Sequence, residues 1–178
     1  IEVIMADALT LHFPREIDVL IAEIIDTGLI DELQVPALNA LRNNGVITNK
    51  TTLIPFHYTT FAQLVHTDNT YYGYQIVVPK HEWPFYAYPR TGWVQTKVEP
   101  ISDVVELVSA DFSLGIIKEQ IVEHVRFKTN KTKVINGIKI FGKIKLSKNV
   151  ELSSTNALNG DKIIPIDPIK NTGSVEVE

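Results

Sequence analysis

Hydrophobic positions near the start of the chain come in short runs that predict two strands and then a helix. Residues 3–5 form one apolar run. Residues 17–23 form a second, with so few polar positions that it predicts a strand buried on both faces. The spacing then changes to that of a helix, which we expect to open at Asp31 or Glu32 and to end at Gly45, where glycine suits a left-handed cap.

The pattern changes after Gly45 to short runs of threonine, valine, isoleucine and aromatic residues separated by turn residues, which is typical of a β-barrel or sandwich. Asn136-Gly137, between two alternating runs, predicts a hairpin turn. Residues 114–124 could hold a helical turn or two. The other strands expected are 51–54, 58–65, 71–78, 104–109, 131–135 and 138–146.

The sequence patterns before and after Gly45 together predict an α+β fold that is mostly β. We expect residues 1–45 to be part of an α/β domain and residues 46–178 to be a β-barrel domain. The chain enters an apolar run directly at Ile1, which favours a missing upstream segment; a trimmed or engineered start is the alternative. Upstream residues would then complete the first domain.

Composition narrows the function classes only a little. The chain has 178 residues and a net charge of −4, which gives no support for non-specific nucleic-acid binding. It has no cysteine, which excludes disulfides and thiolate metal sites and fits a reducing, cytoplasmic location. Five histidines lack metal-ligand spacing, and no apolar run reaches the roughly 18 residues of a membrane helix.

Two glutamates, Glu23 and Glu32, are the strongest candidates for chemistry. Glu23 ends the apolar run 17–23, and a buried strand ends in a carboxylate only for a reason, since burying an unpaired charge is expensive. Ligands bind beyond the carboxyl ends of strands in open α/β sheets, and a second carboxylate returning there from the loop could meet the first. Two carboxylates facing one pocket suit a planar guanidinium.

Each acidic candidate also has a plain structural interpretation. Glu23 could pair with an upstream lysine or arginine, and Glu32 could be a first-turn helix residue that the macrodipole favours. Asp7 follows the first apolar run, where a nucleotide-binding sheet can accept the amine of an adenine, and Ala8 is next to it. Asp7 could equally cap a helix or belong to a solvated turn.

A family resemblance supports the functional interpretation of the glutamates. The segment 22–32 resembles the double-glutamate loop of protein arginine methyltransferases, and its Asp-Thr-x-Leu-Ile-x-Glu ending is most similar to the monomethylating branch. A strand ending at 6–8 precedes it at the expected distance. Segments 100–113, 134–147 and 150–154 are similar to the family's barrel strands.

The resemblance implies a particular fold, cofactor and chemistry. The fold would be the C-terminal part of a Rossmann-like methyltransferase sheet followed by a β-barrel. The cofactor would be S-adenosylmethionine, with Asp7 and Ala8 in its binding site and Glu23 and Glu32 catalytic. The substrate would be a protein arginine, and a homodimer is implied. RNA, a small molecule and a non-enzymatic interaction module stay open as alternatives.

The chain departs from the family pattern in three places. The glycine-rich loop and the ribose-binding acid of the cofactor site are absent, and in the family both come before the point where this chain begins. Residues 158–161 should match a Thr-His-Trp loop but contain neither histidine nor tryptophan. Ile24 and Ile25 replace bulkier residues, which implies a pocket of a different size.

Two further groups of side chains suggest contact surfaces. Seven lysines lie within 128–148 and could touch phosphates, or could form a solvated face that protects an edge strand. Aromatic residues around prolines in 79–93 could line a substrate groove or a dimer contact, or could form a small satellite core: Trp83, Tyr86, Tyr88 and Trp93.

Overall fold

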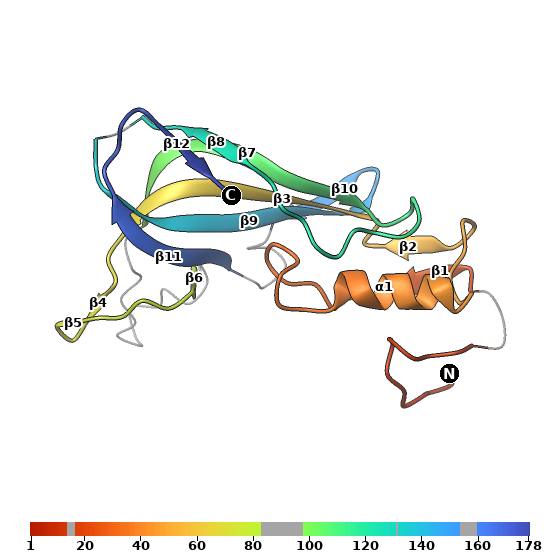
Figure 1. The fold of residues 1–178 in the computed structure, drawn as a ribbon. Helices are drawn as coiled ribbons and strands as arrows, with labels where there is room; N and C mark the ends of the chain where they lie inside the picture. Colours follow the sequence, from red (N-terminus) through yellow and green to blue (C-terminus); the bar gives the residue numbers. More distant parts are fainter. Residues whose placement is uncertain (14–16, 83–97, 131, 154–159) are drawn as a thin grey trace.

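The structure is a computed structural model that describes residues 1–13, 17–82, 98–130, 132–153 and 160–178. The described chain is α+β and mostly β, which confirms the predicted fold class (Figure 1). The four aromatic residues at 83–93 lie outside the described residues, as do Leu158 and Asn159.

A curved antiparallel sheet forms the body of the molecule (Figure 1). Its strands follow the order β6–β11–β9–β3–β7, and β10 pairs with β9. Buried and half-buried residues alternate along most of β3, as in a strand with one face on a core. These strands are β3 (His57–Thr67), β6 (Lys80–Glu82), β7 (Val98–Asp111), β9 (Ile135–Ser147), β10 (Val150–Ser153) and β11 (Asp161–Ile169).

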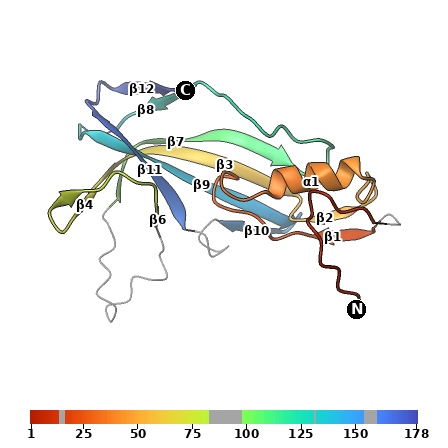
Figure 2. The same ribbon diagram turned by 60° about the horizontal axis from the view of Figure 1, so that its bottom comes forward.

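A second strand pair lies over one end of this sheet. β8 (Val125–Lys128) pairs antiparallel with β12 (Ser174–Val177), and a bridge between Ser102 and Thr129 ties the pair to β7 (Figures 1 and 2). The sheet and the pair enclose an apolar core, so that the arrangement is a partly open barrel. The buried residues of this core are Ala62, Leu64, Ile101, Phe127, Ile135 and Ile140.

The helix and two short parallel strands lie at the other end of the sheet (Figure 2). β1 (Val19–Ile21) pairs with β2 (Thr52–Ile54), and α1 (Gln34–Asn43) connects them. Gly45 ends the helix with a φ of +70°, as the sequence predicts. Because β2 comes from residues 52–54, the small sheet includes residues from both predicted domains.

A second apolar core joins this α/β part to the barrel strands. Leu38 and Leu41 of the helix, Ile25 of the loop after β1 and Leu53 of β2 belong to one cluster with Tyr58 of β3. Phe112, which directly follows β7, and Ile144 of β9 also belong to this cluster. The loop after β1 is therefore buried partly against the barrel itself. Among the described residues, no helix is long and apolar enough to cross a membrane.

The predicted hairpin at Asn136-Gly137 is wrong, because β9 runs straight through both residues. Gly137 pairs with Val65 on one side and with Pro165 on the other. The Asn136 side chain bonds across to β3, accepting from the Thr67 N–H and donating to the Thr67 oxygen, each at 2.8 Å. The actual hairpin turn is at Lys148-Asn149, between β9 and β10.

Four other predicted elements differ from the structure. Residues 3–5 form no strand and are largely exposed. The strand predicted at 17–23 shrinks to Val19–Ile21 and is not buried on both faces. Among the described residues β1 pairs only with β2, and the first and last residues of β1 are exposed. Residues 114–124 hold no helical turn, and the strand predicted at 71–78 is replaced by a small hairpin. That hairpin is β4 (Thr70–Tyr71) with β5 (Tyr74–Gln75).

Candidate functional site

The loop between β1 and α1 carries both candidate glutamates. The strand ends at Ile21, the Ala22 N–H donates to the Ile54 oxygen at 3.0 Å, and Glu23 follows. Glu32 precedes Leu33, the residue that caps α1, so it lies outside the first helical turn. Both side chains are exposed. Neither carboxylate hydrogen-bonds or ion-pairs with any described residue of the chain, so both are available to a ligand.

Asp26 holds the turn that leads to Glu32. Its buried carboxylate accepts from the Asp31 N–H at 3.0 Å and from the Glu32 N–H at 3.3 Å. These bonds keep both residues in a turn, which is why the helix begins at Gln34 and not at Asp31 or Glu32 as the sequence predicts. The backbone position of Glu32 therefore depends on Asp26.

A lysine from the barrel neutralises Asp26. Lys162, on β11, is only 4% exposed, and its Nζ lies 3.3 Å from Asp26 Oδ2. Lys162 also pairs with the carboxylate of Asp31. A buried charge is tolerated only when it is paired and hydrogen-bonded, and this cluster meets both conditions. The barrel thus fixes the loop electrostatically.

The barrel also holds the loop through its backbone. The Gly28 N–H donates to Tyr58 Oη at 2.8 Å, and Thr27 Oγ1 donates to the Gly160 oxygen at 2.9 Å. Gly28 has a φ of +88°, and a Cβ there would lie 2.7 Å from Ile140, so only glycine fits. Gly142 leaves room for the ring of Tyr58, because a Cβ at that position would lie 2.1 Å from Tyr58 Oη.

Tyr58→Phe is expected to lower the free energy of unfolding by about 1–3 kcal/mol. The substitution leaves the buried Gly28 N–H without its acceptor, and an unsatisfied buried donor costs about that much. Urea denaturation of the two proteins measures the difference. Tyr74→Phe, at an exposed tyrosine of β5, is the matched control and should change stability by less than about 0.5 kcal/mol.

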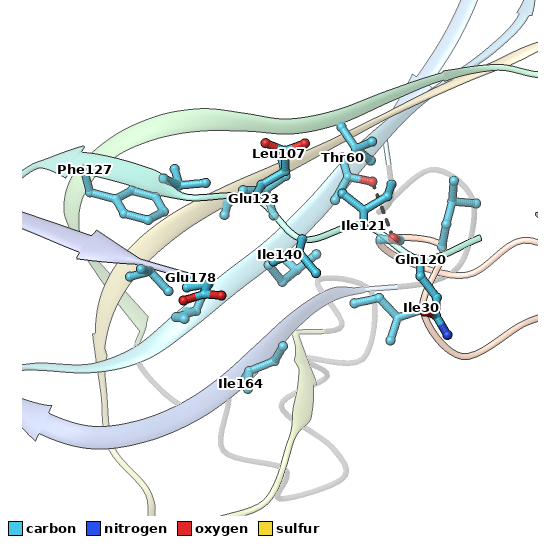
Figure 3. Close-up of a pocket in the computed structure, with 18 of the residues that line it drawn as sticks. Ile30, Thr60, Leu107, Gln120, Ile121, Glu123, Phe127, Ile140, Ile164 and Glu178 are labelled. Atoms are coloured by element: carbon cyan, nitrogen blue, oxygen red, sulfur yellow. Dashed lines mark hydrogen bonds between the residues drawn. The ribbon is translucent and has the colours of Figure 1, made fainter. Parts of the chain in front are cut away.

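Two neighbouring cavities open beside this loop. The smaller, of about 330 Å³, is lined by Glu32 together with the start of α1 and residues 117–119. The larger, of about 660 Å³, extends into the barrel (Figure 3). Residues 28–30 line both of them. Glu32 is thus placed at a cavity, whereas Glu23 lines neither of these two.

The predicted cofactor residues lie in the N-terminal segment, which packs at the C-terminal end of α1, where Asn44 Nδ2 donates to the Leu11 oxygen at 3.1 Å. Asp7 is exposed, and its Oδ1 accepts from the Leu9 N–H at 2.9 Å, which is the interaction of a turn residue. The other carboxylate oxygen accepts no hydrogen bond from a described residue. Ala8 is half-buried. Their role in binding a cofactor stays a prediction.

The predicted basic strip is partly neutralised by the protein's own acids, because three of its lysines, Lys133, Lys139 and Lys143, form ion pairs. Lys139 ion-pairs with Asp161 at 2.7 Å and with Glu82 at 3.1 Å. Burial opposes its charge, but the bonds to these two carboxylates outweigh burial and raise the pKa of Lys139. Lys143 pairs with Glu151. These contacts favour a structural face over a phosphate-binding one. The described residues contain no cluster of three metal-ligating side chains.

The segment expected to match the Thr-His-Trp loop has a structural role in its described part. The Gly160 oxygen accepts from Thr27, Asp161 pairs with Lys139, and Lys162 pairs with Asp26. Sequence reasoning missed Asp26 and Lys162 altogether. The one available signal was a lysine placed directly before the apolar run at 163–164.

Comparisons with known proteins give a related sequence and solved structures of similar fold. No family model matches the sequence. The chain is 34% identical over 82 residues to uncharacterized protein MJ1452 of Methanocaldococcus jannaschii, covering 46% of this chain and 32% of that protein. The chain therefore spans about a third of the length of that relative.

Two solved structures are similar over nearly the whole chain. One is Arabidopsis thaliana protein arginine methyltransferase 10, with a TM-score of 0.69, 13% identity, and coverage of 98% of this chain and 63% of that one. The other is Trypanosoma brucei PRMT1, solved as an enzyme–prozyme heterotetrameric complex with S-adenosylhomocysteine, with a TM-score of 0.65, 9% identity, and coverage of 95% and 58%. At these identities the likeness shows the fold alone.

Proposed function

We propose that this chain is the C-terminal part of an S-adenosylmethionine-dependent methyltransferase that transfers a methyl group to a guanidinium nitrogen of a protein arginine. The observation that carries the proposal is the loop with Glu23 and Glu32. It has the spacing of a double-glutamate loop, it follows a parallel strand in a fold shared with arginine methyltransferases, and both carboxylates are free of partners in the described chain.

The glutamates would bind and orient the substrate. A guanidinium is a poor nucleophile, because its charge is delocalised and its pKa is above about 12. Two carboxylates that accept its N–H groups would localise that charge and leave one nitrogen facing the methyl donor. Orientation of this kind can lower a barrier by several kcal/mol, and charge complementarity in a dry site lowers it further.

The barrel would keep this loop in its binding conformation. Asp26, Lys162 and Tyr58 hold the backbone between the two glutamates, so little order has to be gained when the substrate binds. A mobile loop backbone would instead have to be ordered at each turnover. The rigid loop therefore supports the catalytic interpretation over that of a solvated turn.

S-adenosylmethionine would supply the electrophilic methyl group. Of this chain's residues, Asp7 and Ala8 would contribute to its binding, since one carboxylate oxygen of Asp7 bonds to no described residue and could accept from an adenine amine. The predicted division into residues 1–45 and 46–178 belongs to the same proposal. β2, which pairs with β1, would then lie just beyond that boundary.

The test uses the full-length protein, radiolabelled S-adenosylmethionine and two kinds of substrate. We expect label in histone-like peptides that contain arginine and none in the same peptides with lysine in place of arginine. Transcribed RNA is the second substrate, and label in RNA alone would replace the arginine assignment. Absence of cofactor binding by the full-length protein would contradict any methyltransferase function and favour an interaction module.

A further inference from the structure

The larger cavity is an apolar chamber inside the barrel. Its floor comes from β3, β9 and β11, with Ala62, Ile140 and Ile164 among the lining residues, and its opposite wall includes Ile121 and Phe127 (Figure 3). A volume of about 660 Å³ is within the range of ligand pockets and far exceeds the packing defects of an ordinary core. The chamber is therefore large enough to receive an apolar group from outside.

The charged residues that line this chamber, within the described chain, are all acidic. They are Glu119, Glu123 and Glu178. Figure 3 shows Glu123 near Leu107 and Glu178 toward the end of the chamber where Phe127 lies. An apolar interior with a negative rim is complementary to a ligand that is apolar at one point and positively charged around it.

The rim is held in place by the helix. Asn39, buried on α1, donates to the Ile117 oxygen at 2.8 Å and to Glu119 Oε1 at 2.9 Å, and it accepts from the Ile117 N–H at 2.8 Å. Residues 117–119 are thus fixed although they form no helix or strand. Glu123 makes no bond to a described residue. Of the three rim carboxylates, that of Glu119 is preorganised, that of Glu178 lies 4.0 Å from His124 Nδ1, and that of Glu123 is free of bonds to described residues.

The chamber continues into the cavity that contains Glu32. Both are lined by residues 28–30, Val108, Glu119, Ile121 and Glu123. The two cavities are therefore contiguous, and an extended peptide that crosses from one to the other advances about 3.3–3.6 Å per residue. A chain whose arginine reaches Glu32 would therefore place a side chain two to four residues away over the chamber.

We propose that the chamber binds a large apolar side chain of the protein substrate, two to four residues from the target arginine, with lysine or arginine residues around it. The inference rests on the proposed function for the arginine itself. Burial of the apolar side chain would contribute binding energy at a point remote from the reacting nitrogen, and the rim glutamates would select basic flanking residues.

The test is direct binding, measured by fluorescence anisotropy with the full-length protein and without cofactor. The probe is a fluorescein-labelled peptide, Gly-Lys-Gly-Gly-Arg-Gly-Gly-Phe-Gly-Lys-Gly, and its counterpart has alanine in place of phenylalanine. We expect about tenfold tighter binding of the phenylalanine peptide, from the area of one buried aromatic ring. Ala62→Leu, which places a larger side chain in the lining of the chamber, should remove that difference.

A charge change tests the rim separately. Glu123→Lys, at an exposed position, should weaken binding of the phenylalanine peptide at least threefold and reduce its salt dependence. Glu106→Lys is the matched control, because Glu106 is exposed and comes directly before the chamber residue Leu107 on β7. It should leave binding unchanged.

The outcomes separate this inference from the proposed function. Equal affinity of the two peptides, or a phenylalanine preference that survives Ala62→Leu, would overturn the chamber's role even if arginine peptides are methylated. Binding of the apolar dye 1-anilinonaphthalene-8-sulfonate without any peptide binding would give the chamber a different occupant and also overturn it. A phenylalanine preference that Ala62→Leu removes, with no methylation of any peptide, would support the chamber and contradict the proposed reaction.

Discussion

Glu23→Gln and Glu32→Gln are each expected to lower kcat/KM for methylation of an arginine peptide by about a thousandfold. Glutamine keeps the size of the side chain but removes the charge that would localise the guanidinium, and losing one such preorganised group costs about 10² to 10³ in rate. The measurement is the initial rate of label transfer from S-adenosylmethionine by the full-length protein. Because the two carboxylates act as a unit, we expect kcat/KM of the double variant to be at most about tenfold lower than that of either single variant.

Stability controls accompany these variants. Both side chains are exposed and unpaired in the described chain, so the free energy of unfolding should change by less than about 0.5 kcal/mol. Glu106→Gln, an exposed glutamate on β7 away from the loop, should leave activity unchanged. Full activity in both Glu23→Gln and Glu32→Gln would remove the carboxylates from the mechanism.

Lys162→Met is expected to lower the free energy of unfolding by about 3 kcal/mol. Methionine fills a similar volume, but Asp26 would stay buried without its cation, and breaking a buried pair from one side costs about 3–5 kcal/mol. The lower end of that range applies because Asp26 also accepts two backbone N–H groups. Urea denaturation curves measure the change.

Lys143→Met is the matched control for that substitution. Lys143 pairs with Glu151 at 3.4 Å, and both side chains are about half exposed, so its loss should cost less than about 1 kcal/mol. If Lys162→Met is as mild as Lys143→Met, the buried cluster does not anchor the loop. Because the cluster positions the Glu32 backbone, Lys162→Met should also lower the methylation rate more than Lys143→Met does.

The sequence predicts the helix and the long barrel strands well, because their patterns agree with their environment. Tyr58 to Val65 lies within β3 and Val104 to Ser109 within β7. Asn136-Gly137 shows the limit of such reasoning. Its strong local turn signal loses to pairing with β3 and β11, which are distant in sequence, and the asparagine amide is used to bond across strands.

Some residues of the candidate site could be predicted from a local sequence motif, and others depend on contacts between distant parts of the chain. Glu32 could be found from the sequence because its loop carries a recognisable spacing. Asp26 and Lys162 could not, since 136 residues separate them and only the folded barrel brings them together. The strand before Glu23 would be buried on both faces only if further strands or helices covered it. The described chain places none there, so Val19 and Ile21 are exposed.

The most direct test of the central claim is a crystal structure of the full-length protein with an arginine peptide and S-adenosylhomocysteine. The measured quantities are the distances from the carboxylate oxygens of Glu23 and Glu32 to the guanidinium nitrogens. We predict that both carboxylates accept from one guanidinium at about 2.7–2.9 Å. Side chains that point apart, or a Glu23 held by a lysine or arginine of the protein with no opening beside it, would contradict the account.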